Sequence, residues 1–135
     1  MAAPLSGNSV HHRHLDFRPG DRAALGTDFL RRALADWAVD PAAGADALLV
    51  GAELLSNAAR HAHGPRRLNL DLAAGILRVA VTDSSPAAPH PRAAPAGADG
   101  GYGLRIVDRL ALDWGSVPVG DGKTVWARLP APPRG

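Results

Sequence analysis

Apolar residues recur every three or four positions in two long stretches near the start of the chain, which predicts two amphipathic helices. The first covers residues 23–39. The second covers residues 42–63 and begins after Asp40-Pro41, a capping residue followed by a proline at the first helical position. Seven small or apolar residues form its core stripe: Ala47, Leu48, Gly51, Leu54, Leu55, Ala58 and Ala62.

The rest of the chain alternates apolar and polar residues in short runs, which predicts strands joined by tight turns. Strands are expected at 67–73, 76–82, 114–119 and 123–129. A third helix is expected at 103–112, and the proline-rich stretch 84–100 before it has no periodicity and is interpreted as a lid or a disordered loop. Helices that alternate with hairpins predict an α+β fold, a two-layer sandwich with a mixed, mostly antiparallel sheet and helices on one face.

The length of 135 residues predicts one domain, which we place at residues 15–130. A loose arm is expected at 1–14 and a tail at 131–135. The arm contains the run from His11 to His14, which could bind a metal, but a solvated tail is favoured because no neighbouring carboxylate or cysteine completes a site.

Composition narrows the class of protein. The chain has no cysteine, which excludes disulfides and thiolate metal sites. The net charge of +2 and the scattered arginines argue against nucleic acid as a partner, as does an aromatic content of 4%. No stretch reaches the length of a membrane span and no signal-peptide pattern is present, so a cytoplasmic protein is expected.

Polar side chains on the second helix form the first candidate site. Glu53 and Asn57 lie one helical turn apart and point the same way, so together they can hold a hard cation and activate a nearby hydroxyl. These two residues, with Arg60 and His61, fall on or near the stripe opposite the core face. The alternative is an ordinary solvated polar face.

Two further segments carry candidate chemistry. Asp83 ends a buried strand, where its carboxylate can accept a hydrogen bond from an exocyclic amine such as that of adenine; the alternative is a turn aspartate that caps its own backbone. The glycines at 100–103 precede a helix, where free N–H groups can approach an anion; the alternative is a plain hinge. The spacing of a Walker loop is absent, which disfavours a P-loop site.

The order of these segments resembles the GHKL superfamily of ATP-binding domains, whose fold is also called the Bergerat fold. Residues 53–61 resemble its asparagine box, 81–86 its aspartate box and 101–107 its second glycine box. Residues 122–126 are similar to the last strand of the branch of anti-sigma-factor serine kinases. The resemblance covers roughly residues 20–130.

The resemblance implies a role for each matching residue. Asn57 would ligate Mg²⁺ through its side-chain oxygen, and Glu53 would be the general base that takes the proton from a serine hydroxyl or water. Asp83 would read the adenine amino group, with Thr124 supporting Asp83 or a water at the adenine.

The remaining positions implied to bind the nucleotide surround the lid. Gly101 and Gly103 would let the lid end approach the phosphates, and Leu104 belongs to the same box. His61 would have a supporting role. Ser85 and Ala87 stand where the family often has two glycines, with Pro86 between them, and the resemblance associates this proline-bearing form with the anti-sigma-kinase branch.

The resemblance implies an ATP- and Mg²⁺-dependent serine/threonine protein kinase. It would phosphorylate an anti-anti-sigma antagonist and sequester a sigma factor, and the resemblance is compatible with a homodimer. Two alternatives remain open: a non-catalytic ATP-binding interaction module, and an ATPase switch that needs no partner. A complete histidine kinase and a gyrase-type machine are not expected, because no phosphoacceptor helix precedes the domain and no transducer domain follows it.

Overall fold

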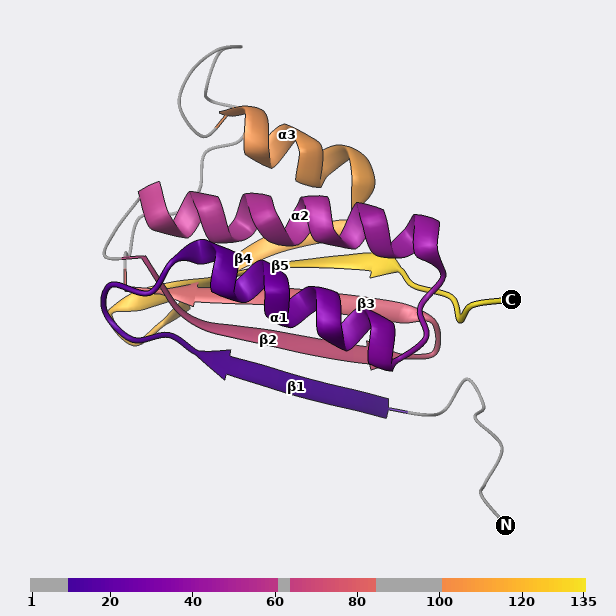
Figure 1. Ribbon diagram of the computed structural model, residues 1–135. Helices are drawn as coiled ribbons and strands as arrows, with labels where there is room; N and C mark the ends of the chain where they lie inside the picture. Colours follow the sequence, from indigo (N-terminus) through magenta and orange to yellow (C-terminus); the bar gives the residue numbers. More distant parts are fainter. Residues whose placement is uncertain (1–9, 61–63, 85–100) are drawn as a thin grey trace.

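In its described residues, the chain forms a five-stranded sheet with three helices on one face (Figure 1). The computed structural model describes residues 10–60, 64–84 and 101–135, with the side chains of the last range described from Leu104 onward. The elements in chain order are β1 (Val10–Asp16), α1 (Ala23–Asp36), α2 (Pro41–Arg60), β2 (Pro65–Ala73), β3 (Ile76–Asp83), α3 (Gly101–Leu110), β4 (Asp113–Val119) and β5 (Gly122–Pro130).

The strand order is β1-β2-β3-β5-β4, and each of these neighbouring pairs is antiparallel. The predicted α+β two-layer sandwich is therefore confirmed, with an antiparallel rather than a mixed sheet. The expected lid at 85–100 lies outside the described residues.

The first strand begins earlier than the sequence pattern indicated. Residues 10–14 were expected in a loose arm, but they form most of β1 and pair with β2 along the edge of the sheet. The ring of His11 stacks on Trp37 with centroids 5.4 Å apart, and the guanidinium of Arg13 lies 5.3 Å from the same ring. Arg13 also pairs with Asp36 at 2.8 Å. These contacts attach the edge strand to the end of α1, which explains why polar residues form a strand here.

The C-terminal residues 131–135 pack against the body of the domain. Ala131 is buried, and its N–H donates to the carbonyl of Gly75 in the β2–β3 turn. The N–H of Asp40, at the α1–α2 junction, donates to the carbonyl of Pro132. The segment expected as a tail therefore joins the helical layer to one end of the sheet.

Ion pairs between facing residues hold both edge strands. Arg67 of β2 contacts Asp16 of β1 at 2.6 Å, and Arg128 of β5 contacts Asp113 of β4 at 2.7 Å. The hydrogen bonds from the two guanidiniums lower the pKa of both aspartates. Because these groups are exposed, the pairs fix the register of the edges and add little stability.

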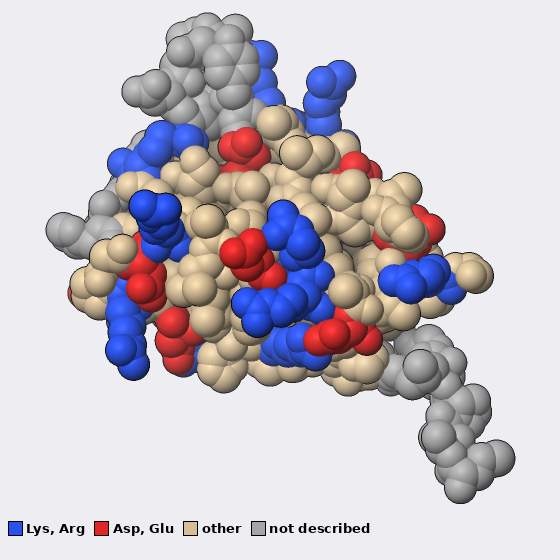
Figure 2. Space-filling model, in the orientation of Figure 1, with Lys and Arg blue, Asp and Glu red and all other residues tan. Residues whose placement is uncertain are grey.

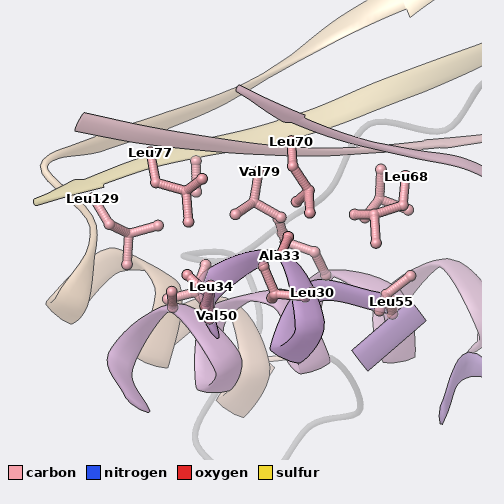
Figure 3. Packing of buried hydrophobic residues seen from close by; sticks show 14 of the residues in the cluster. Leu30, Ala33, Leu34, Val50, Leu55, Leu68, Leu70, Leu77, Val79 and Leu129 are labelled. Atoms are coloured by element: carbon pink, nitrogen blue, oxygen red, sulfur yellow. The ribbon is translucent and has the colours of Figure 1, made fainter. Parts of the chain in front are cut away.

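One hydrophobic core fills the space between the sheet and the helices (Figure 3). Its largest fully buried apolar side chains are Leu30, Leu54, Leu55, Leu68, Leu70, Leu77, Leu129, Val50, Val79, Val81 and Val107. Helix α2 packs on β3 and β5 and contacts α1 on one side and α3 on the other. Neighbouring elements therefore cover a wider part of the surface of α2 than its one apolar stripe.

Two glycines allow α1 and α2 to approach each other closely. A Cβ atom on Gly51 of α2 would lie 2.5 Å from Cδ2 of Leu30, and one on Gly26 of α1 would lie 2.7 Å from Cδ1 of Leu55. Leu30 and Leu55 are fully buried, so neither side chain has room to move away. This contact fixes the position of α2 over the sheet, and α2 carries two of the predicted site residues.

We expect Leu30→Ala to lower the free energy of unfolding by about 2–5 kcal/mol, because it removes a fully buried side chain and leaves a cavity. Leu25 on the same helix is 40% exposed, so Leu25→Ala is the matched control and should cost about 0.5 kcal/mol or less. Urea denaturation of both variants measures the difference. Equal losses would contradict the placement of Leu30 at the centre of the helix contact.

The surface does not concentrate charge of one sign on the face in Figure 2, where basic and acidic side chains lie next to each other. Among the described residues, no helix is long and apolar enough to cross a membrane.

Candidate functional site

Helix α2 carries Glu53 and Asn57 one turn apart, and the two differ in burial. Glu53 is half-buried, whereas Asn57 is only 3% exposed. The sequence pattern placed Asn57 on a polar stripe opposite the core, and that placement was wrong. The reason is that α2 is covered by α1, α3 and the sheet together, so its buried surface extends beyond the apolar stripe.

The side-chain oxygen of Asn57 is buried and accepts no hydrogen bond in the described part of the chain. Leaving a buried polar atom unpaired costs about 1–3 kcal/mol, so such an atom in a folded protein calls for an explanation. A bound ligand is one, because an amide oxygen suits a hard cation whose other positions are taken by phosphate and water oxygens. Asn57 therefore fits the predicted Mg²⁺ ligand on chemical grounds.

The end of β3 carries Asp83, which is 1% exposed and forms an ion pair with Lys123 of β5. The Nζ atom of Lys123 lies 3.0 Å from one carboxylate oxygen of Asp83 and 3.2 Å from the other. Lys123 itself is 3% exposed and is the only lysine of the chain. The carboxylate predicted to bind adenine thus lies inside the helix-covered layer beside a buried ammonium group.

Sequence reasoning missed Lys123, although the sequence contains a signal for it. Val125, Ala127 and Leu129 alternate along β5 and face the core. The same period of two places Lys123 on the core face as well. A lysine on the apolar face of a strand requires a carboxylate partner, and the antiparallel pairing supplies Asp83 directly opposite.

Thr124, which was expected to support Asp83, points to the other face of the sheet. It stands opposite Thr82, and the two hydroxyl oxygens are 2.7 Å apart. Successive side chains of a strand alternate between faces, so Thr82 and Thr124 lie on the side away from the helices. The side chain of Lys123, the residue before Thr124, pairs with the carboxylate of Asp83 instead.

The turn between β4 and β5 closes tightly on the end of β3. A Cβ atom on Gly122 would collide with the carbonyl oxygen of Asp83 and lie 2.9 Å from the Cα of Ser84. Only glycine therefore fits at residue 122 without a backbone shift. This close approach brings the start of β5, and with it Lys123, against Asp83.

The glycines of the predicted phosphate site lie at the start of α3. The helix begins at Gly101, two residues before the predicted start, and Gly103 is in its first turn. Leu104 is 3% exposed and so is part of the interior. His61 and Ser85 lie outside the described residues.

The fold brings most of these segments to one region, because α2 packs on β3 and also on α3. Asn57 is on the helix that covers the strand ending in Asp83, and the glycines begin the helix beside it. Within residues 10–60, 64–84 and 104–135, no group of three or more histidine and acidic side chains could hold a metal ion.

Comparison with known proteins adds a family-level result. Residues 18–129 match the family described as histidine kinase-like ATPase domain, a range that includes all the predicted site residues. No curated protein is similar enough to the chain to count as a match.

Proposed function

Since the chain belongs to the histidine kinase-like ATPase domain family, we propose that it is an ATP-dependent protein kinase that phosphorylates a serine or threonine of a partner protein. Membership of the family implies ATP binding. The kinase activity, the Mg²⁺ dependence and the identity of the partner are the parts that we propose.

The unpaired, buried oxygen of Asn57 is the observation that supports this proposal most strongly. A helix that serves only to fill the core would not retain a polar atom with no partner, because a leucine there would cost less. The oxygen is explained when it ligates Mg²⁺ bound to the phosphates of ATP. When bound, Mg²⁺ would neutralise part of the phosphate charge.

Glu53 lies one turn before Asn57, is half-buried, and is the only glutamate of the chain. In the proposed reaction its carboxylate accepts the proton of the substrate hydroxyl. The hydroxyl oxygen then bonds to the γ-phosphorus of ATP, the bond from that phosphorus to the β,γ-bridging oxygen breaks, and ADP leaves. A positioned general base contributes about 10²–10⁴-fold to such a rate.

The partner class follows from the branch of the family that the sequence resembles. We propose that the substrate is a small antagonist protein of the anti-anti-sigma type and that a sigma factor is the protein sequestered. A pull-down from an extract of the source cells, with and without ATP, tests both. Recovery of neither protein would contradict this assignment without affecting the proposed ATP site.

We expect Glu53→Gln to reduce transfer of the labelled γ-phosphoryl group to the captured protein by about 10²–10⁴-fold, because the amide cannot accept the proton. Affinity for ATP and Mg²⁺, measured by calorimetry, should stay within about threefold, since the shape of the side chain is kept. Asp46→Asn, which neutralises an exposed carboxylate on the same helix, is the matched control and should change neither quantity.

Unchanged transfer in Glu53→Gln would refute the role of Glu53 as the base. ATP binding with no transfer in the wild-type chain would favour the non-catalytic ATP-binding module. Phosphate release in the absence of any partner would favour the ATPase switch.

A further inference from the structure

The pair formed by Asp83 and Lys123 is the most buried charged feature of the described residues, with side-chain exposures of 1% and 3%. The two residues face each other across the β3–β5 pairing, and Gly122 lets the turn before Lys123 press against the end of β3. The ammonium spans both carboxylate oxygens, at 3.0 and 3.2 Å. The strand pairing, the close turn and these two contacts together fix the position of the carboxylate.

The chemical state of Asp83 follows from this contact. A carboxylate in an ion pair is ionised, and an ionised carboxylate can only accept hydrogen bonds, whereas a protonated one can also donate. The two oxygens together offer about four acceptor positions. A buried aspartate without a cation beside it would instead tend to hold a proton and become a donor.

This difference matters for the choice of purine. An amino group at position 6, as in adenine, donates a hydrogen bond, whereas a carbonyl at that position, as in hypoxanthine or guanine, accepts one. A carboxylate that faces position 6 and only accepts can pair with the amino group and repels the carbonyl oxygen. We propose that Lys123 is a specificity-determining residue, which keeps Asp83 an acceptor and so selects a 6-amino purine nucleotide over a 6-oxo one.

The proposal rests on the proposed function, because it requires that Asp83 contacts the base of the nucleotide. It assigns to Lys123 a role through Asp83 rather than a contact with the nucleotide. Lys123 is thus a positioning residue, and its removal should change the preference between nucleotides rather than affinity alone.

The test compares ATP with inosine triphosphate, in which a carbonyl replaces the 6-amino group of the base and N1 carries a hydrogen. Calorimetry at fixed Mg²⁺ gives the dissociation constants of both for the wild-type chain, Lys123→Met and Lys123→Arg. Methionine keeps much of the length and volume without the charge, and arginine keeps the charge. Where Lys123→Met does not fold, as judged by its thermal transition, Lys123→Gln takes its place.

We expect the wild-type chain to prefer ATP by about tenfold or more, because a site that pairs with a donor rejects an analogue that lacks it. Lys123→Met should lose at least about tenfold of that preference, and Lys123→Arg should keep it within about threefold.

Three results would overturn the inference. One is a Lys123→Met variant that binds both nucleotides more weakly by the same factor, as a purely structural lysine predicts. Another is tighter ATP binding with an unchanged preference, as a lysine that merely competes with the base predicts. The third is a wild-type chain that binds the two nucleotides equally well. Absence of ATP binding to the wild-type chain is a different result, which removes the proposed function itself.

Discussion

Replacing Asp83 by alanine is expected to lower the free energy of unfolding by about 3–5 kcal/mol and to abolish ATP binding. The loss of stability arises because Lys123, at 3% exposure, is left in the interior without the carboxylate of Asp83. In a buried ion pair, the attraction between the two charges roughly balances the free-energy cost of removing both from water. Removing one partner takes away the attraction but leaves the cost of burying the other, so the single variant loses more stability than the intact pair provides.

Two further variants distinguish the effect of breaking the buried ion pair from the effect of removing an aspartate side chain. The double variant Asp83→Ala/Lys123→Met should recover a large part of the lost stability, since no charge is then left buried. Asp16→Ala removes an aspartate from an exposed ion pair at the sheet edge and should have a much smaller effect. Urea denaturation measures all three.

A small effect on the free energy of unfolding would contradict this prediction. A loss below about 1 kcal/mol in Asp83→Ala would mean that the pair behaves like an exposed one, against the burial seen here. ATP binding that survives in the double variant would remove Asp83 from the nucleotide site. Since the double variant contains no buried charge, such a result could not be attributed to unfolding.

The arrangement of helices and strands was largely predictable from hydrophobic periodicity. Helix α2 was expected from Ala42 and begins at Pro41, and the turn at Ala74-Gly75 joins β2 to β3 as expected. Such features are local, because a cap, a turn or an alternating run is decided by neighbours in the sequence. The edge strand β1 was missed at 10–14 because its partners, β2 and Trp37, are distant in the chain.

The candidate site residues were proposed from the sequence, but the environment of each could not be. Asn57 was chosen as a polar residue one turn after Glu53, yet its burial depends on α3 packing against α2. The partner of Asp83 depends on the β3–β5 register, which joins residues 40 positions apart. Sequence periodicity predicts the face of the sheet or helix on which a side chain lies. The residues that it contacts on that face depend on how strands distant in the sequence pair.

Asn57 provides the second large effect, in which stability and function change in opposite directions. Asn57→Leu replaces the amide by an apolar group of similar shape, so the buried unpaired oxygen disappears. We expect the free energy of unfolding without nucleotide to rise by about 1–2 kcal/mol, because the desolvation cost of that oxygen is no longer paid. The same variant should lose Mg²⁺-dependent ATP binding, because the proposed ligand is gone.

Urea denaturation with and without ATP and Mg²⁺ measures both effects in one experiment. A ligand that binds only the folded chain adds RT ln(1 + [L]/Kd), or about 2.7 kcal/mol at 100 times Kd, so the wild-type chain should gain stability and Asn57→Leu should not. Asn69→Leu, at a half-buried asparagine of β2, is the matched control and should keep the nucleotide-dependent gain. A gain that persists in Asn57→Leu would exclude Asn57 as the metal ligand, and a less stable Asn57→Leu chain would show that its oxygen is satisfied in the folded state.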